Sequence, residues 1–411
     1  MDLMSLHEST LTVRPRNPFA PTFGAEPPLL VGRDEILQGV VDAWATGPTH
    51  PGYTTLLLGR RGAGKTVVLE ALRTRGGDRG WLSISAAAAT SGLLNRLGHG
   101  ASEHLNRNAP SLAEDIRADL AAASIGLGSA YDPGADLSRR LAIVLKALAT
   151  HLQAHGAGLL ITVDELHAGE TDELRMLGVV IQDVTRVGQL PMAFVGAGLP
   201  LLEDTLLADT SVTFLQRCAR YEIDFLEPTE AWTALAEPVR ERGGRMPAEA
   251  VEHAVAVSQG YPFMVQLVGF HAWQAALDPT TAVTLQDVAA GAETARRQVG
   301  QLVIAPMWRD LSEGSRRFLA AMALDDGPSR TSDIAIRLGV SGGYVGVYRH
   351  RLMKSGLVAA AGHGRLDFAL EAARPWIRGL DEYQLLCETL KLADGPSVGF
   401  ARPRADREPE S

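Results

Sequence analysis

Short, mostly apolar runs alternate with longer amphipathic stretches through the first half of the chain. Their lengths suit strands rather than helices, and their scarcity of polar positions suits strands covered on both faces. These runs lie at residues 54–58, 81–84, 158–163 and 191–195. Residues 136–155 predict a helix, because one face carries the apolar side chains Leu137, Leu141, Val144, Leu145 and Leu148. The alternation predicts an α/β fold with a parallel sheet covered by helices.

The remaining patterns in the first three hundred residues are mainly helical. Residues 85–135 are rich in Ala, Ser and Gly and only weakly periodic, which suggests helices with a loose insertion. We expect the strands to stop by Pro228 and residues 229–300 to be wholly helical. The expected helix starts there are Pro228, Pro247, Pro262 and Thr284.

A different pattern follows at residues 308–372. Residues 331–341 predict a capped helix, a glycine turn and the start of a second helix that continues to residue 355. One face of that second helix carries Val345, Tyr348 and Leu352. Two strands are expected after it, at residues 357–361 and 365–370. A helix-turn-helix followed by a hairpin resembles a winged helix.

A chain of 411 residues is too long for one core and predicts several units. The expected units are an extended proline-rich arm (1–30), a phosphate-loop α/β core (31–228), a helical lid (229–305), a winged helix (306–380) and a final helix with a tail (381–411). The first helix of the core should open near Asp34. The stretch from Gly395 to Ser411 is polar and should be poorly ordered.

Bulk properties exclude several classes of protein. The net charge of −9 argues against a uniformly basic nucleic-acid coat but leaves room for a local basic patch. The two cysteines, Cys218 and Cys387, rule out a disulfide framework and a cysteine metal site. Because we find no signal-like N-terminus and no apolar run of membrane-spanning length, we expect a cytoplasmic protein without a membrane partner.

The strongest chemical signal is an octet between a predicted strand and a predicted helix. It comprises Gly59, Arg60, Arg61, Gly62, Ala63, Gly64, Lys65 and Thr66. Strand, glycine-rich loop and helix in this order form a phosphate-binding loop, in which glycines let backbone amides turn toward phosphate oxygens. Lys65 is expected to reach the β- and γ-phosphates, and the Thr66 hydroxyl to bind Mg²⁺. The octet therefore predicts a nucleotide site.

Two acids end the buried run at residues 158–163. Asp164 is expected to hold the water shell of Mg²⁺, and Glu165 to polarise the attacking water. An acidic pair after a strand is a weak signal alone, but it gains weight downstream of a phosphate loop. His167 is either a γ-phosphate sensor or an ordinary capping or solvated residue.

Two arginines lie between the last predicted strand of the core and the helical region. Arg217 or Arg220 is either an arginine finger that completes the site of an adjacent subunit, or a member of an ordinary salt bridge. The first alternative implies a nucleotide-dependent homo-oligomer. Cys218 between them is expected to be a small packed residue rather than a reactive one.

Taken together, these motifs resemble the AAA+ ATPases, and more narrowly the origin-recognition-like and STAND-type ATPases of prokaryotes. The resemblance covers residues 15–370 and adds Asn17-Pro18-Phe19 to the motifs above. It implies ATP as the nucleotide, with Val31, Gly32 and Arg33 bordering the adenine. It also implies that Gly260, Tyr261 and Pro262 close over the base from the lid.

The chain departs from that family in two places. Initiator-type members typically carry a lid arginine near the lid glycine, whereas the Gly-x-Pro at 260–262 looks more like the STAND branch. Many related ATPases also carry a polar side chain after the strand at 191–195, where this chain has Gly196, Ala197 and Gly198. Either a neighbouring residue substitutes for it, or hydrolysis is slow.

The C-terminal pattern predicts contact with duplex DNA. Its second helix would enter the major groove, and phosphates would be held by Arg349, His350, Arg351, Lys354, His363 and Arg365. Glycines at 342, 343 and 346 on that helix favour sequence-tolerant binding. Three hypotheses stay open: an ATP-driven switch on DNA, a STAND-like signalling or scaffold protein whose winged helix binds protein, and an accessory ATPase of a mobile element.

Overall fold

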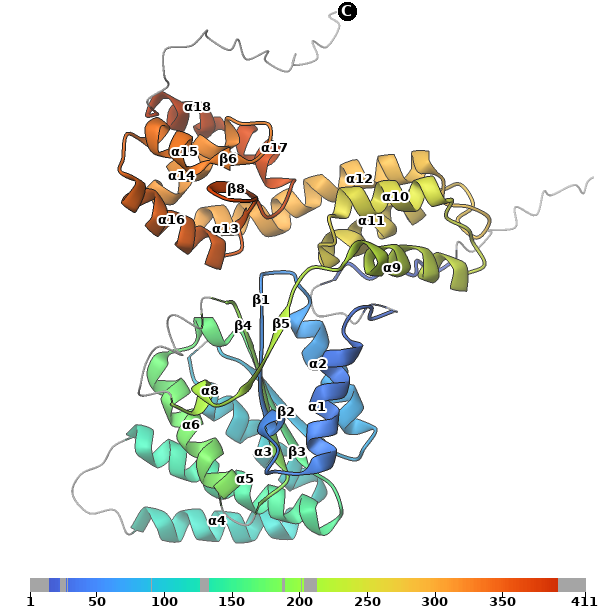
Figure 1. The fold of residues 1–411 in the computed structure, drawn as a ribbon. Coiled ribbons are helices and arrows are strands. Elements are labelled where there is room, and N and C mark those ends of the chain that lie inside the picture. Colours follow the sequence, from blue (N-terminus) through green and yellow to red (C-terminus); the bar gives the residue numbers. More distant parts are fainter. Residues whose placement is uncertain are drawn as a thin grey trace, which may run out of the picture. The chain divides into compact units, whose positions relative to one another are not determined.

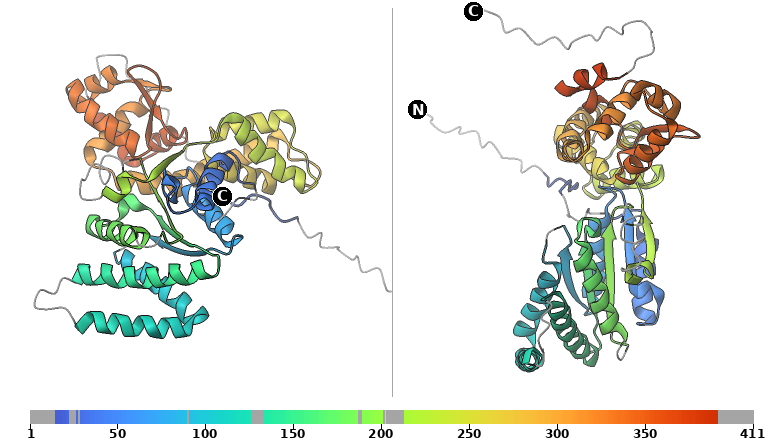
Figure 2. Two further views of the ribbon diagram at one scale, coloured as in Figure 1. Left: turned by 60° about the horizontal axis from the view of Figure 1, so that its bottom comes forward. Right: turned by 90° about the vertical axis from the view of Figure 1, so that its left-hand side faces the viewer.

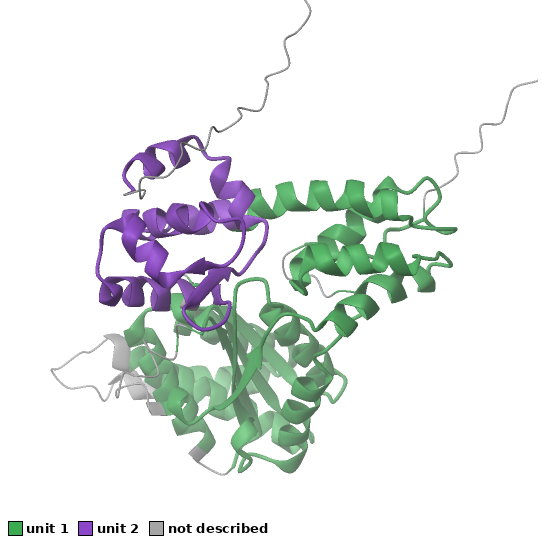
Figure 3. Cartoon of the chain, turned by 45° about the horizontal axis from the view of Figure 1, so that its top comes forward, with its two compact units in different colours: residues 1–303, 354–356 green, residues 304–353, 357–411 purple. Residues whose placement is uncertain are grey.

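The computed structural model describes residues 15–22, 27, 29–89, 91–125, 133–186, 189–200, 202 and 213–390. The chain divides into two compact units (Figure 3). The first comprises residues 1–303 with 354–356, and the second comprises residues 304–353 with 357–411. The tail from Gly395 to Ser411, expected to be poorly ordered, lies outside the described residues.

The first unit is built on a parallel sheet with the strand order β2-β3-β4-β1-β5 (Figure 1). The strands are β1 (Thr54–Gly59), β2 (Leu82–Ala87), β3 (Leu159–Asp164), β4 (Met192–Gly198) and β5 (Ala219–Ile223). The first four confirm the predicted strands and the predicted α/β class. The sequence-based expectation missed β5, because this edge strand alternates the exposed Arg220 and Glu222 with less exposed residues.

Helices cover both faces of the sheet (Figure 2). Each face has its own apolar core. On one face, α1 and α2 pack against Leu57 and Leu160. On the other face, α3, α5 and α6 pack against Ile161 and Phe194. The bounds are α1 (Asp34–Thr46), α2 (Lys65–Gly77), α3 (Leu93–Asn108), α4 (Pro110–Ile125), α5 (Pro133–Ala154), α6 (Thr171–Arg186) and α8 (Thr213–Gln216), with 3₁₀ turns η1 (Pro51–Tyr53) and η2 (Leu166–Ala168).

The helices expected within residues 85–135 are present as α3, α4 and the start of α5, and the buried Leu97, Leu105 and Ile116 join the core. Residues 126–132 of the same region, where the expected loose insertion could fall, lie outside the described residues. The first helix begins at Asp34 as predicted, but Arg33 precedes it as the N-cap and makes no side-chain capping bond.

The predicted helical region after Pro228 is present in the first unit. Its helices are α9 (Pro228–Glu241), α10 (Ala248–Ser258), α11 (Pro262–Ala275) and α12 (Leu285–Val299), followed by the π-helical stretch η3 (Gly300–Ile304). Thr284 caps α12 through a reciprocal capping box with Asp287. The N-terminal arm packs here, since the Asn17 side chain donates to Phe270 O over 3.0 Å and Phe19 is buried against Gly269.

The second unit combines helices with a small antiparallel sheet of strand order β6-β8-β7. Its elements are α13 (Ala305–Arg309), α14 (Glu313–Ala323), β6 (Ser329–Arg330), α15 (Thr331–Leu338), α16 (Gly342–Lys354), β7 (Val358–Ala360), β8 (Arg365–Phe368), α17 (Ala373–Arg378) and α18 (Asp381–Glu388). Gly339 makes the predicted turn between α15 and α16 at φ +66°. Val345 and Leu352 face the core as expected, and the Tyr348 ring stacks on Phe318. Strand β6 was not anticipated.

Among the described residues, none of the helices is both long and apolar enough to cross a bilayer.

Candidate nucleotide site at the carboxyl edge of the sheet

The predicted phosphate loop connects the end of β1 at Gly59 to the start of α2 at Lys65. Gly62 and Gly64 adopt φ +73° and +97°, conformations that residues with a Cβ rarely take. The Lys65 ammonium folds back over the loop and donates to Gly59 O at 2.8 Å and Arg60 O at 2.9 Å. Burial lowers the pKa of Lys65, while the nearby carboxylates of Glu165 and Asp164 raise it. The loop is therefore a small cationic cradle at a helix N-terminus, which suits an anion.

A pair of hard oxygen ligands lies beside the cradle. Thr66 Oγ1, in the first turn of α2, donates to Asp164 Oδ2 at the end of β3 over 2.6 Å. The other oxygen, Asp164 Oδ1, accepts a bond from the Glu165 backbone amide at 2.8 Å. Across the described residues there is no cluster of three or more His, Cys, Asp or Glu side chains that would hold a metal alone. One hydroxyl and one carboxylate are nevertheless the protein ligands that Mg²⁺ uses when phosphates complete its shell.

Glu165 lies next in the chain with a strained backbone. Its φ of +55° is left-handed, which is rare for a non-glycine residue and common at functional sites. Burial and the neighbouring Asp164 raise its carboxyl pKa, while Lys65 and Arg61 lower it. The charges that act on it thus include the cations of the phosphate loop, so its carboxylate belongs to the same site.

His167 contacts Glu165 directly. Its Nε2 lies 3.1 Å from Glu165 Oε2, and its Nδ1 accepts a bond from the Leu199 amide at 3.3 Å. Burial, reinforced by the positive charges of Lys65 and Arg61, lowers the pKa of His167 to about 4. The ring is therefore neutral near pH 7, and because Nδ1 accepts, Nε2 carries the hydrogen that faces the carboxylate. The His167 side chain is only 9% exposed, so it is not a solvated surface residue.

The end of β4 brings no polar side chain to the site, as the sequence indicated. Gly196 is needed there for packing, because a Cβ would lie 2.4 Å from Leu166 Cδ1. Leu166 is fully buried and directly follows Glu165. The glycine therefore makes room for Leu166, the buried residue that follows Glu165.

Arg33, predicted to border the adenine, is 7% exposed and contacts the phosphate loop. Its guanidinium donates to the carbonyl of Ala63 at 3.2 Å and to the carbonyl of Asp224 just after β5. Burial lowers the pKa of Arg33, and the acids Glu230 and Asp224 oppose that effect. The Arg33 guanidinium thus connects the phosphate loop to the segment that follows β5. Val31 and Gly32 are half-buried before it.

The predicted lid motif also reaches the loop. Gly260 has φ +69°, and a Cβ there would meet the Leu226 carbonyl at 2.0 Å. Tyr261 is 2% exposed and lies so close to Gly62 that a Cβ on that glycine would be 2.1 Å from the Tyr261 hydroxyl. Pro262 opens α11. The motif therefore packs on the phosphate loop itself.

Sequence reasoning missed the residues that follow β5. Arg60 pairs with Asp224 at 3.2 Å, and its guanidinium lies over the Phe225 ring at 4.7 Å. The centroids of the Phe225 and Tyr261 rings are 5.1 Å apart, so Phe225 lies against both Arg60 of the loop and Tyr261 of the predicted lid motif. No sequence signal marked Asp224 or Phe225, because the strand before them was itself overlooked.

The structure does not bring Arg217 and Arg220 to the phosphate loop of their own chain. Both are exposed, with Arg217 in the turn before β5 and Arg220 near its start. In the parallel register Arg220 stands opposite Leu56, whereas the end of the strand, Ile223, stands opposite Gly59. Between them Cys218 is buried, and burial raises its thiol pKa to about 12, as befits a packed residue.

The residues predicted to bind DNA lie in the second unit, apart from Lys354, which ends α16 and whose side chain is not described. His350, Arg351, His363 and Arg365 are exposed, and Arg349 is half-buried. The same helix also exposes Tyr344 at 42% and Val347 at 66%.

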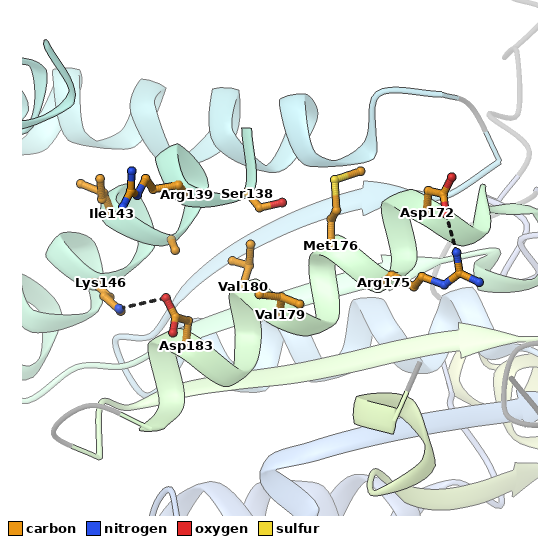
Figure 4. Close-up of a pocket in the computed structure, with 11 residues that line it drawn as sticks. Ser138, Arg139, Ile143, Lys146, Asp172, Arg175, Met176, Val179, Val180 and Asp183 are labelled. Carbon is orange, nitrogen blue, oxygen red and sulfur yellow. Dashed lines mark hydrogen bonds and ion pairs between the residues drawn. The ribbon is translucent and has the colours of Figure 1, made fainter. Parts of the chain in front are cut away.

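A groove of about 850 Å³ lies between α5 and α6, on the first unit (Figure 4). Ion pairs Lys146–Asp183 and Arg175–Asp172 lie along it, over apolar side chains such as Met176 and Val179. Its described lining includes none of the predicted site residues. The groove is therefore distinct from the nucleotide site.

Two family models match parts of the chain. Residues 29–195 match the AAA ATPase domain family, and residues 301–377 match a domain of unknown function, DUF8462. The fold is similar to that of a Walker-type ATPase of Pyrococcus abyssi, with a TM-score of 0.60 and 16% identity over 85% of this chain and 96% of that one. The fold is also similar to that of the ORC2 protein of Aeropyrum pernix, solved as ADPNP–ADP complexes. That match has a TM-score of 0.60 and 13% identity, and it covers 90% of this chain and 97% of that one. No curated protein matches the chain.

These matches confirm the predicted AAA-type ATPase fold and the coarse family resemblance. Within the matched residues 29–195, the phosphate loop and the acidic pair lie at one edge of the sheet.

Proposed function

We propose that this protein binds ATP with Mg²⁺, hydrolyses it, and works as a nucleotide-dependent switch that engages duplex DNA. The observation that carries the ATPase part is the assembly of Lys65, Thr66 and Asp164 around one cradle, with Glu165 next to them. The decisive experiment measures ATP turnover with and without duplex DNA at fixed salt.

Each residue of the assembly has a distinct task. The loop amides and the Lys65 ammonium bind and orient the phosphates, since a cation and helix N-terminal amides favour negative charge. Thr66 and Asp164 hold Mg²⁺, which supplies charge neutralisation at the phosphates. Glu165 orients the attacking water and accepts its proton, a task that its raised pKa suits.

The base of the nucleotide would lie between two motifs that already pack on the loop. Val31, Gly32 and Arg33 form one border, and Gly260, Tyr261 and Pro262 form the other from the helical lid (residues 229–305). The contact of Tyr261 with Gly62 supports this assignment, because it makes the lid sensitive to what the loop holds. The ADPNP–ADP complexes of the Aeropyrum pernix ORC2 protein support an adenine nucleotide.

We assign Arg217 and Arg220 to the site of an adjacent subunit. Both are exposed and remote in register from their own loop, which supports a contribution across an interface rather than within one chain. A mixture of Arg217→Ala and Lys65→Ala proteins tests this. Each alone should be inactive, and mixed oligomers should regain activity because some interfaces then hold an intact loop and an intact arginine.

The second unit is the proposed DNA-binding part, as a winged helix over residues 306–380. Its exposed basic side chains on α16, on β8 and in the hairpin turn support this, since phosphate contacts dominate affinity for DNA. Arg349, His350, Arg351, Lys354, His363 and Arg365 would hold phosphates while α16 lies in the major groove.

A salt titration of duplex binding tests the DNA assignment. The pair Arg351→Ala and Arg365→Ala should weaken binding to all duplexes and reduce the slope of log K against log salt by about two. The matched control is Arg240→Ala with Arg297→Ala, which removes the same charge from exposed lid positions. Equal effects of the two pairs of substitutions would show that only the total charge of the protein matters, and would contradict a DNA site on the second unit.

A STAND-like signalling or scaffold role is the second candidate. The exposure of Tyr344 and Val347 on α16 favours it, because large apolar side chains at the surface suit a protein partner. Salt-insensitive or absent duplex binding, with ATP turnover intact, would select this alternative.

A further inference from the structure

Glu165 needs an orienting partner. Its backbone is left-handed at φ +55°, and its carboxylate is subject to charges from Asp164, Lys65 and Arg61. The ends of the neighbouring strands carry no polar side chain to hold it, since β2 ends at Ala87 opposite Asp164 and β4 ends at Gly198. A carboxylate in such a mixed field occupies several positions unless a hydrogen bond selects one of them.

His167 supplies that hydrogen bond and a second one. Its Nε2 lies 3.1 Å from the Glu165 carboxylate, and its Nδ1 accepts from the amide of Leu199 at 3.3 Å. Leu199 directly follows β4. A single neutral ring thus joins the acid after β3 to the backbone after β4, and both of its nitrogens are used.

We infer that His167 is a positioning residue that fixes the Glu165 carboxylate relative to the end of β4, in place of the polar side chain that β4 lacks. This inference rests on the role proposed above for Glu165. Because the ring bonds to the Leu199 backbone, any displacement of the β4 end moves the carboxylate as well. His167 therefore makes hydrolysis responsive to the segment after β4 without contacting the nucleotide.

The kinetic test compares His167→Ala with His167→Gln. Alanine removes both bonds, whereas the glutamine amide keeps one donor and one acceptor on a planar group. We expect alanine to lower kcat by about tenfold or more, but by less than the loss of the general base itself, which costs about 10²–10⁴-fold. The Kd for ATP should be unchanged. Glutamine should restore most of the loss. The matched control is His99→Gln, an exposed histidine on α3, which should behave as the unchanged protein.

Three outcomes would overturn the inference. The first is an unchanged kcat in His167→Ala. The second is a glutamine variant no better than alanine, which would indicate a purely structural or ring-specific role. The third is a weakened affinity for ATP, which would indicate direct contact with the nucleotide. In a Glu165→Gln background, His167→Ala should have little further effect on residual turnover, since it acts through that carboxylate.

A spectroscopic test separates this inference from the proposed ATPase activity. Side-chain ¹⁵N–¹H correlation spectra at pH 7 should show one histidine, missing in His167→Gln, as the neutral Nε2–H form with Nδ1 unprotonated. A ring that averages both neutral forms would refute the bridge, that is, the pair of hydrogen bonds from His167 to Glu165 and Leu199, even if turnover is normal. A correct signal in a protein without turnover would instead refute the proposed hydrolysis and leave the bridge in place.

Discussion

The hydroxyl of Thr66 donates a hydrogen bond of 2.6 Å to the carboxylate of Asp164, although 98 positions separate the two residues in the chain. Thr66 lies in the first turn of α2, and Asp164 ends β3. Strands β3 and β1 are not neighbours, because β4 lies between them in the sheet. The pairing therefore requires the whole parallel sheet to be in register, and it marks the point on which phosphate and metal chemistry would converge.

Lys65→Ala should abolish binding of ATP. The Lys65 ammonium lies over the loop and donates to its backbone. Arg60 cannot replace this charge because it pairs with Asp224, and a backbone amide carries no charge. Titration with a fluorescent ATP analogue measures the effect. Lys146→Ala is the matched control, because that lysine lies in the α5–α6 groove and pairs with Asp183. Equal losses in both variants would contradict the assignment.

Glu165→Gln should retain ATP but stop turnover. The amide keeps the size of the side chain and loses the capacity to accept a proton, so kcat should fall by about 10²–10⁴-fold. Phosphate release and nucleotide affinity are measured on the same preparation. Normal turnover in this variant would show that another group accepts the proton.

Thr66→Val should raise the concentration of Mg²⁺ needed for half-maximal turnover, whereas Thr66→Ser should not. Valine has nearly the shape of threonine without its hydroxyl, so only the oxygen ligand is lost. A magnesium titration at saturating ATP measures this. Identical titrations for the two variants would mean that the Thr66–Asp164 bond is only structural.

Gly62→Ala should destabilise the first unit more than Gly64→Ala. Both residues have positive φ, and a Cβ there costs about 1–2 kcal/mol. At Gly62 the new Cβ would also overlap the Tyr261 ring, adding about 1–3 kcal/mol, whereas nothing lies within 4 Å at Gly64. Urea unfolding without nucleotide compares them. Equal destabilisation would show that the lid does not rest on the loop.

Acid should destabilise the protein partly through His167. Its pKa in the folded state, about 4, is below the ordinary 6.5, so the unfolded chain binds the proton more readily. The neutral ring therefore favours folding above pH 6.5, and that contribution is lost as pH falls toward 4. The loss reaches about 3 kcal/mol by linkage. As pH falls through this window, the unfolding free energy of the unchanged protein should decrease relative to that of His167→Gln. Parallel pH profiles of the two proteins would contradict the shift.

The local chemistry could be predicted from residues that are adjacent in the chain. A glycine-rich octet between an apolar run and a helix predicts a phosphate loop, because those conformational and charge requirements are met by residues adjacent in the chain. For the same reason the helix starts at Pro228, Pro262 and Thr284 were predictable. Strand β5 was not, because an edge strand with alternating exposed residues resembles an ordinary surface segment.

Which of these residues contact one another depends on the packing of the folded chain. The bridge from Glu165 through His167 to Leu199, the contact of Arg33 with Ala63, and the approach of Tyr261 to Gly62 all join segments that are distant in sequence or follow different strands. Such contacts depend on strand order and register, which are fixed by burial over the whole sheet. Local periodicity therefore identifies the parts of a site, while the packing of the complete core determines their geometry.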